Sequence, residues 1–402
     1  MRILIATDAV TLAHSARAST LAAGLAERGH EVTAAGVAAI ARFAAPPVAW
    51  RELGSIGQQR FTRALATGAP PFRVADLRGY IHEERRLIKA VKPDVIVTDF
   101  RPTAVMSARA AGIPSATLIN AYWSPAARGT LPMPVLPGTA RLPLRWAQGL
   151  FDLGSRFVMP AHCRPWNLAR LELGQPSLGK DLRAIYCDGD VVLYSDVPGM
   201  FELRPLAPTH HFVGPVLWSP VLDEPPWWRS LPKSQPTIYV TLGSSGSKQI
   251  LGRVVAALAG DSHNLLVSAA GADTVALASL PYTFAAPYLD GRKTSQRADI
   301  VVCNGGSMST QQAFTFGKPV LGIASNMDQF LNMQGVVAAG AGICLRADRV
   351  TPAAVREACR ALLHDATYAA AAKAIGERQA QYDSVALIEV VLQKVVQAGA
   401  RR

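Results

Sequence analysis

Residues 301–309 read VVCNGGSMS, and after an apolar run residues 317–323 read GKPVLGI. A short β-branched segment that breaks into two glycines and then into hydroxyl residues is typical of a buried parallel strand that turns sharply into a helix. The helix N-terminus would present N–H groups to the turn, and Gly305 and Gly306 lack the β-carbons that would keep a ligand from the backbone. We interpret this turn as a diphosphate site, although an ordinary strand-to-helix turn has the same pattern.

A second apolar strand, residues 320–324, ends close to Asp328 and Gln329, and Asn332 follows three positions later. The carboxyl ends of parallel strands meet at one edge of a sheet, so these side chains are expected beside the phosphate site. A carboxylate and an amide can pair with vicinal hydroxyls, as on a sugar. We therefore interpret Asp328 and Gln329 as the residues that bind the sugar.

Together these segments resemble the donor-binding signature of GT-B glycosyltransferases of the family 1 type, which include plant and bacterial UDP-glycosyltransferases and macrolide glycosyltransferases. The family motif begins with His where Asn304 stands here, and an acidic residue often stands at the position of Gln312. The resemblance is carried by Asn304, Gly305, Gly306, Ser309, Gln312, Gly317, Pro319, Asp328, Gln329 and Asn332. It implies an α/β fold of the GT-B type, with two Rossmann-like, doubly wound domains facing a cleft and a C-terminal helix that crosses back to the N-terminal domain.

Length and pattern support two domains, because 402 residues exceed the usual size of a single core. We predict an N-terminal, acceptor-binding Rossmann-like domain over residues 1–214 and a linker over residues 215–236. A nucleotide-sugar-binding Rossmann-like domain is expected over residues 237–382. Residues 383–402 are expected to form the helix that packs back on the N-terminal domain.

Two residues of the first domain are candidates for acid–base chemistry. His14 lies in the loop after the first expected strand, sixteen positions before His30, as in the family; the family Pro three positions after it is Arg17 here. An imidazole titrates near pH 6.5 and can accept a proton, while Asp99, at the end of a neighbouring strand, could hold its other nitrogen. The alternative is that His14 is a solvated loop residue and Asp99 a helix cap.

Further donor contacts are implied by the resemblance. The Gly-Ser turn that begins at Gly243 faces the donor in the family, and the segment of Tyr288 and Leu289 meets the base; the turn lacks the spacing of a P-loop. The expected donor-binding residues are Gly243, Ser244, Ser245, Tyr288, Leu289, Asn304, Gly305, Gly306, Ser307, Ser309, Gln312, Asp328 and Gln329.

The D-x-D pattern of residues 188–190 does not indicate a metal site, because Asp-Gly-Asp before an apolar strand is an ordinary turn. We expect no metal and no cofactor, since the NDP-sugar is a co-substrate and GT-B enzymes do not need that metal.

The amino-acid composition and the distribution of charge limit the classes of binding partner. Half of the residues are hydrophobic, 17% are charged and the formal net charge is +12. The basic residues are scattered and not interleaved with aromatics, which favours an anionic small molecule or a bacterial membrane surface over nucleic acid.

Five cysteines without a C-x-x-C pair, no signal-peptide pattern and no apolar stretch of about 18 residues favour a reduced, cytoplasmic protein. Peripheral contact with the inner face of the membrane is an additional expectation. The protein is expected to be a monomer or a homodimer.

We predict an inverting glycosyltransferase that moves a sugar from a UDP- or dTDP-sugar to a hydroxyl of a largely apolar acceptor, such as a natural-product aglycone or a lipid. Residues 120–144, rich in Pro, Trp and Leu, are a candidate wall for that acceptor or a packed interdomain loop. Residues 151–173 are expected to be helical, with interruptions near Pro160 and Pro165. The alternatives are a lipid-linked glycosyltransferase or an NDP-sugar epimerase on the same fold, and a GT-B-like binding protein without catalysis.

Overall fold

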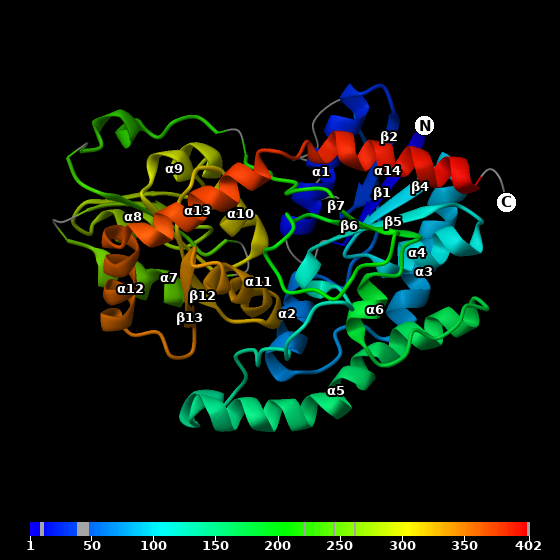
Figure 1. The fold of residues 1–402 in the computed structure, drawn as a ribbon, viewed down its shortest axis with the longest axis horizontal. Coiled ribbons are helices and arrows are strands. Elements are labelled where there is room, and N and C mark those ends of the chain that lie inside the picture. The colour runs from blue at the N-terminus through cyan, green and yellow to red at the C-terminus, as the bar shows by residue number, and fades with distance from the viewer. Residues whose placement is uncertain are drawn as a thin grey trace. The chain divides into compact units, whose positions relative to one another are not determined.

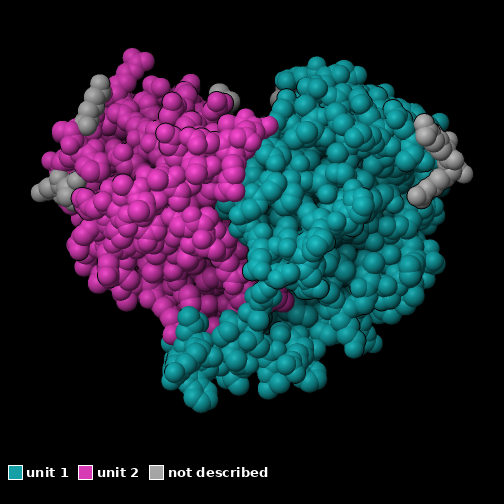
Figure 2. Space-filling view, viewed as in Figure 1, with its two compact units in different colours: residues 1–130, 136–218, 382–402 teal, residues 131–135, 219–381 magenta. Residues whose placement is uncertain are grey.

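The computed structural model (Figure 1) describes residues 1–8, 12–37, 48–220, 222–232, 234–243, 246–260 and 263–399. The chain divides into two compact units (Figure 2). Unit 1 comprises Met1–Thr130, Leu136–Trp218 and Tyr382–Arg402, and unit 2 comprises Leu131–Val135 and Ser219–Gln381.

Unit 1 contains a parallel sheet with the strand order β3-β2-β1-β4-β5-β6-β7. Its strands are β1 (Arg2–Thr7), β2 (Glu31–Gly36), β3 (Ala49–Glu52), β4 (Val95–Asp99), β5 (Ser115–Ile119), β6 (Val191–Tyr194) and β7 (His210–Phe212). Its α-helices are α1 (Leu12–Glu27), α2 (Gln58–Thr67), α3 (Val74–Val91), α4 (Pro102–Ala110), α5 (Leu144–Glu172), α6 (Leu182–Tyr186) and α14 (Ser384–Gly399). Short 3₁₀ turns are η2 (Ala121–Trp123) and η3 (Thr139–Arg141).

Strand β1 shows why the sheet is covered on both faces. Successive side chains of a strand point to opposite faces. Ile3 and Ile5 belong to a core cluster with residues of α1 and α14, whereas Leu4 and Ala6 pack in a cluster with residues of α3 and α4. A strand buried on both faces must be apolar throughout, which is what residues 3–6 show.

Unit 2 repeats this plan with a parallel sheet in the order β10-β9-β8-β11-β12-β13. Its strands are β8 (Thr237–Thr241), β9 (Asn264–Ser268), β10 (Thr283–Ala286), β11 (Ile300–Cys303), β12 (Val320–Ala324) and β13 (Gly342–Arg346). Its helices are α7 (Lys248–Leu258), α8 (Thr274–Ala278), α9 (Gly291–Arg297), α10 (Ser307–Thr315), α11 (Met327–Ala338), α12 (Pro352–His364) and α13 (Ala366–Gln379), with the 3₁₀ turn η4 (Pro226–Ser230).

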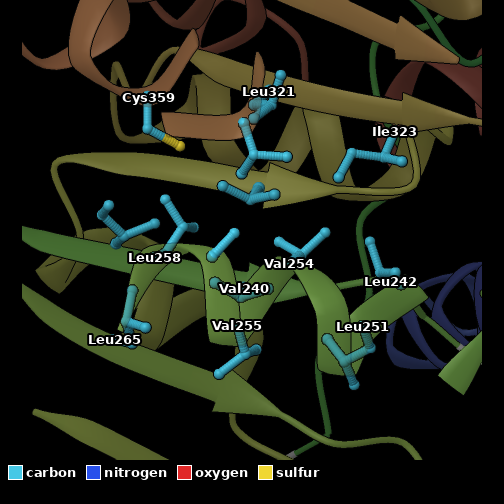
Figure 3. Close-up of a cluster of buried hydrophobic side chains, with 14 of the residues drawn as sticks. Val240, Leu242, Leu251, Val254, Val255, Leu258, Leu265, Leu321, Ile323 and Cys359 are labelled. Atoms are coloured by element: carbon cyan, nitrogen blue, oxygen red, sulfur yellow. The ribbon is translucent and has the colours of Figure 1, made fainter. Parts of the chain in front are cut away.

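The main core of unit 2 lies between the sheet and the helices α7 and α12 (Figure 3). Val240 and Leu321 from the strands meet Leu251 and Val255 of α7 and Cys359 of α12. This packing fixes the carboxyl edge of the sheet, where the loops that carry candidate site residues begin.

Each sheet reverses its direction of growth once. In unit 1 the chain builds β2 and β3 on one side of β1 and then places β4 on the other, and in unit 2 it builds β9 and β10 before placing β11 beside β8. At such a switch point the loops after two adjacent strands diverge and leave room for a ligand beyond the carboxyl ends. Ligand sites are therefore expected after β1 and β4 in unit 1 and after β8 and β11 in unit 2.

The C-terminal helix α14 belongs to unit 1, as the GT-B prediction requires. Ile388 and Leu392 are fully buried in the same core cluster as α1. Glu389 accepts a hydrogen bond from Arg28 and one of 2.9 Å from His30 Nε2. His30 thus has a structural role on this face.

Two sequence expectations about helices are wrong. Helix α1 begins at Leu12, so His14 lies in its first turn and not in a loop. Helix α5 runs without interruption from Leu144 to Glu172 through both Pro160 and Pro165. Figure 1 shows that α5 changes direction along its length. Such a bend is how a helix accommodates the loss of the backbone hydrogen bonds that proline cannot form.

None of the described helices combines the length and the apolarity that crossing a bilayer requires.

Candidate active site

The switch point of unit 1 brings the two predicted acid–base residues together. Asp99 is the last residue of β4, and His14 lies on the first turn of α1, just after β1. His14 Nδ1 lies 2.8 Å from Asp99 Oδ1, with side-chain exposures of 21% and 1%. A carboxylate accepts hydrogen bonds and does not donate them, so Nδ1 carries the proton and Nε2 is left with a lone pair.

Arg17 is the residue that the sequence interpretation missed. Its Nε and one terminal nitrogen donate to the two oxygens of Asp99, both at 2.8 Å, and its other terminal nitrogen donates to Asn120 Oδ1 at 2.9 Å. It also lies 3.3 Å from His14 Nδ1, an approach that is no hydrogen bond when Nδ1 is protonated. Because α1 begins at Leu12, residues 14 and 17 lie on one helical face. A sequence prediction that started the helix at residue 12 would have placed Arg17 beside His14.

The charge balance around Asp99 follows from these contacts. Burial acts to raise the pKa of Asp99, but the charge of Arg17 and then that of His14 outweigh it and hold this pKa below its usual range. Asp99 therefore stays ionised, and it accepts hydrogen bonds from both Arg17 and His14.

Buried polar residues that follow β5 and β6 hold Arg17 in place. Asn120, which follows β5, donates through Nδ2 to the carboxylate of Asp196 at 3.2 Å, and the backbone N–H of Ala121 donates to Asp196 at 2.6 Å. Asn120 and Asp196 are buried. The ends of β4, β5 and β6 thus contribute to one buried polar network that places His14.

A cluster of aromatic side chains adjoins the imidazole of His14. The ring of His14 stacks on Phe100 at 4.7 Å and 13°, and Phe100 also contacts Tyr186 at 5.1 Å and Phe61 at 5.8 Å. Phe100 has a φ of 54°, an uncommon value for a bulky residue that costs roughly 1–3 kcal/mol. That backbone turns the ring that follows Asp99 toward the imidazole. Trp123 meets Tyr186 at 5.5 Å, so the apolar surface extends to η2.

The switch point of unit 2 holds the Asn-Gly-Gly turn between β11 and α10. Gly305 has a φ of +80°, and a β-carbon there would lie 2.7 Å from Met333 Cγ. Asn332 Nδ2 donates to the Gly305 carbonyl at 2.8 Å and to Thr310 Oγ1 at 3.0 Å. Asn332 is thus a buried residue that fixes the turn.

Asn304 closes the turn with its own side chain. Its Oδ1 accepts a 3.0 Å hydrogen bond from the Gly306 N–H, so the donor Nδ2 is directed elsewhere. A β-carbon on Gly243, which has a φ of +63°, would lie 3.4 Å from that Nδ2. The turn after β8 therefore adjoins Asn304, while Ser244 and Ser245 lie outside the described residues.

The other predicted donor residues occupy neighbouring positions. Ser307 and Ser309 lie in the first turn of α10, whose N–H groups have no partner within the helix. A β-carbon on Gly291 would lie 2.5 Å from Gln312 Oε1, so Gln312 lies against the start of α9. Tyr288 is 55% exposed and Leu289 is buried, so Leu289 can present only its backbone.

Asp328 and Gln329 lie in the first turn of α11, and they differ in surroundings. Gln329 Oε1 accepts from the Ser325 N–H at 2.8 Å and from the Asn326 N–H at 3.3 Å, and Asn326 Oδ1 accepts from the Gln329 N–H at 3.0 Å. The reciprocal pair of Asn326 and Gln329 is a capping box. Gln329 is 3% exposed, whereas Asp328 is partly exposed. The amide oxygen of Gln329 is therefore used within the fold.

Comparison with known proteins identifies the family. Residues 254–394 match the family model described as Erythromycin biosynthesis protein CIII-like, C-terminal domain. A PGL/p-HBAD biosynthesis glycosyltransferase of Mycobacterium tuberculosis (strain ATCC 25177 / H37Ra) is 39% identical over 378 residues, which are 94% of this chain and 88% of the relative. The chain belongs to the GT-B glycosyltransferases of the family 1 type.

A second relative of this glycosyltransferase is a PGL/p-HBAD biosynthesis rhamnosyltransferase of Mycobacterium bovis (strain BCG / Pasteur 1173P2), which is 38% identical over 94% of this chain and 84% of its own length. The solved structure of Spinosyn Forosaminyltransferase SpnP has a TM-score of 0.72, 17% identity and 99% coverage of both chains. Spinosyn Rhamnosyltransferase SpnG, complexed with thymidine diphosphate, has a TM-score of 0.67, 18% identity and coverage of 97% and 100%. These structures share the GT-B fold.

The D-x-D carboxylates of the glycosyltransferase form hydrogen bonds and ion pairs with other residues of unit 1. Asp188 accepts a 2.9 Å hydrogen bond from Arg109 and pairs with Arg170, and Asp190 accepts from the Ser115 N–H at 2.8 Å. Within the part of the chain that the structure describes, no group of three or more His, Cys, Asp or Glu residues could hold a metal ion.

Proposed function

We propose that this glycosyltransferase moves a sugar from a UDP- or dTDP-sugar to a hydroxyl of a largely apolar acceptor, with inversion at the anomeric carbon. The hydrogen bond between His14 Nδ1 and Asp99 at a topological switch point carries the proposal, because it leaves Nε2 as a base. SpnG has been solved with thymidine diphosphate and with spinosyn aglycone, which supports a nucleoside diphosphate donor and a small-molecule acceptor.

In the proposed reaction the acceptor hydroxyl gives its proton to His14 Nε2 as its oxygen bonds to the anomeric carbon. The bond between that carbon and the diphosphate oxygen breaks, and the diphosphate leaves with the electron pair. Asp99 stabilises the imidazolium that forms and keeps the ring in the required tautomer. One direct displacement inverts the anomeric centre.

Unit 2 would supply the donor site. The first turn of α10 offers N–H groups and the positive end of a helix dipole, and Gly306 leaves the backbone open to a phosphate. Asn304 Nδ2 would donate to a phosphate oxygen. Asp328 would accept from sugar hydroxyls, while Gln329 would mainly hold the first turn of α11 in place.

The acceptor class is inferred from the surface next to the base. Phe61, Phe100 and Trp123 are partly exposed aromatic residues in the ring cluster that contains His14. Such a surface suits an apolar aglycone or lipid, and His14 is then the polar group that contacts the hydroxyl of the acceptor.

The test combines donor binding with turnover. UDP, dTDP and GDP are first compared by the rise in thermal midpoint, which identifies the nucleotide that binds the folded protein. With the matching NDP-sugar, His14→Ala is expected to lower single-turnover transfer or NDP-sugar hydrolysis by about 10²- to 10⁴-fold, with the nucleotide Kd unchanged. Asp99→Asn is expected to cost less.

The control is His364→Ala, which removes an exposed histidine of α12. It should leave both turnover and nucleotide affinity at wild-type values. Turnover of His14→Ala close to wild type, with binding intact, would contradict the assignment of the base.

A further inference from the structure

Helix α5 exposes a row of large apolar side chains, here called the α5 stripe: Trp146, Leu150, Leu153, Phe157, Leu168 and Leu171. The spacings of four, three and four residues, followed by eleven and three, keep these positions on one helical face. Their exposed fractions run from 39% for Leu168 to 75% for Phe157. Among the described residues, nine of the fifteen exposed large hydrophobics lie between residues 142 and 171, and such a concentration of exposed apolar side chains is typical of an interaction surface.

The α5 stripe takes no part in the core cluster that α5 forms with α3. Helix α5 already has a buried face, on which Cys163, Trp166 and Ala169 join a core cluster with Leu77 and Ile81 of α3. The stripe lies outside that cluster.

A basic pocket borders the C-terminal end of the stripe. It has a volume of about 380 Å³ and lies between α3 and the residues around Glu172 of α5. Four cations line it, namely Arg78, Arg85, Arg86 and Lys89, together with His82. Arg78 donates to Glu172 at 2.8 Å, but within the described chain Arg85, Arg86 and Lys89 have no carboxylate at ion-pair distance. An anion would balance this charge.

We propose that the α5 stripe and this pocket form a surface that binds a bilayer containing anionic phospholipids. Helix α5 lies in the plane of the interface with its apolar side chains among the acyl chains, and the pocket takes a headgroup phosphate. The exposed Arg145, Arg156 and Arg164 of the same helix add positive charge beside the apolar row, which is the composition of an interfacial amphipathic helix. The inference does not depend on the proposed activity.

A lipid surface fits the stripe better than a second copy of the chain. A helix pair needs a straight seam, and Pro160 and Pro165 interrupt the hydrogen-bonding pattern of α5 in the middle of the stripe. A seam between two copies would also bring like charges together, because the exposed charges from residue 145 to residue 164 are three arginines. Asp152, the acidic residue in this stretch, is only partly exposed and accepts a hydrogen bond from Gln148. A bilayer can adapt to a bent helix and complements a single sign of charge.

The experiment is co-sedimentation of the full chain with vesicles of phosphatidylcholine alone and of phosphatidylcholine mixed with phosphatidylglycerol. The wild type is expected to sediment with the mixed vesicles and to be released by salt. Trp146→Ser with Phe157→Ser should lower the partition coefficient by about tenfold or more, because two exposed aromatic anchors are lost. Arg85→Gln with Arg86→Gln should lower it by about tenfold on the mixed vesicles only.

The matched control is Val275→Ser with Val390→Ser, which removes two exposed apolar side chains elsewhere, and it should bind like the wild type. Circular dichroism and thermal midpoints establish that each variant is folded. The proposal is overturned if the wild type sediments with neither vesicle or if the aromatic variant binds as well as the wild type. It is also overturned if that variant converts a dimer into a monomer by sedimentation velocity, because the stripe would then be a contact between copies. If the arginine variant binds like the wild type, the pocket takes no headgroup.

Discussion

At the scale of single residues, the main feature of this site is that Arg17 and His14 both donate hydrogen bonds to Asp99. A base that relies on one carboxylate gains most when that carboxylate has no other cation to neutralise. Here Arg17 covers both oxygens of Asp99 at 2.8 Å, and His14 contacts one of them. The guanidinium holds the carboxylate in place and keeps it ionised, but it also weakens the field that Asp99 exerts on the imidazolium.

Replacing Arg17 by Met should therefore change the pH dependence of the reaction. Without the guanidinium, Asp99 stabilises the imidazolium more strongly, so the base is lost to protonation at higher pH. We expect the acid limb of the kcat/KM profile to move up by about one pH unit. Arg17→Lys, which keeps the charge but not the fork, should move it less.

Protein stability must be followed alongside. Breaking a buried ion pair costs about 3–5 kcal/mol, so the Met variant should also unfold more easily. A variant that is less stable but whose acid limb stays in place would show that Arg17 only supports the fold.

At the scale of elements, the turn between β11 and α10 assigns different tasks to its two glycines. Gly305 takes a φ of +80°, and its surroundings leave no space for a β-carbon, with Met333 Cγ at 2.7 Å. Gly306 has a φ of −71°, which any residue adopts, and a β-carbon there would meet Asn304 Oδ1 at 3.2 Å. The first glycine is therefore required by the fold, whereas the second is not required by its backbone conformation, and we propose that its lack of a side chain admits the phosphate.

This division predicts a separation of stability from binding. Gly305→Ala should lower the free energy of unfolding by about 2 kcal/mol or more, because it adds strain and a steric clash. Gly306→Val should lose NDP-sugar binding with a smaller loss of stability, because its side chain occupies the path of the phosphate.

Gly252→Ala in α7 is the control, since a β-carbon there has no atom within 4 Å; it should be neutral or stabilising by about 0.5–1 kcal/mol. Wild-type affinity for the NDP-sugar in a folded Gly306→Val protein would place the phosphate elsewhere.

At the scale of the whole molecule, four histidines make stability depend on pH. Burial lowers the pKa of His162, His210, His211 and His263 below the usual value. The unfolded chain then binds more protons than the folded one once the pH falls below about 6.5. The stabilisation is therefore complete above that pH and is lost as the pH falls through the lower folded values.

The thermal midpoint should accordingly fall as the pH is lowered from 7.5 to 5. The free energy of unfolding should decrease by at most about 1.4 kcal/mol per pH unit for each histidine. Partial exposure reduces this limit. His162→Gln should flatten the slope, because one of the titrating groups is gone. A slope unchanged in that variant would mean that His162 also titrates normally in the folded protein. Carboxylates such as Asp99, whose pKa lies below the usual range, add a further loss only near pH 4 and below.

The sequence by itself determined the features that depend on local pattern. The apolar run of residues 320–324 predicted a buried parallel strand, and Asp99 was expected at the end of another strand, which the structure has as β12 and β4. Residues 301–309 predicted a strand, a glycine turn and a helix, which the structure has as β11 and α10. Parallel strands end at one edge, so Asp99 could be placed near His14 from sequence, although His14 was expected in a loop and lies in the first turn of α1. The spacing of the motif residues indicated the GT-B family, which the comparisons confirm.

Only the tertiary structure decided which groups share a partner and which surfaces stay exposed. Arg17 reaches Asp99 across 82 positions of sequence, and Asn332 reaches the Gly305 carbonyl across 27. No local pattern encodes such distances, because they depend on how strands and helices pack. Trp146 and Phe157 of α5 face solvent, whereas Cys163, Trp166 and Ala169 of the same helix pack in a core cluster with α3. Which apolar residues of a helix are covered depends on what packs against it, and only the tertiary structure decides that.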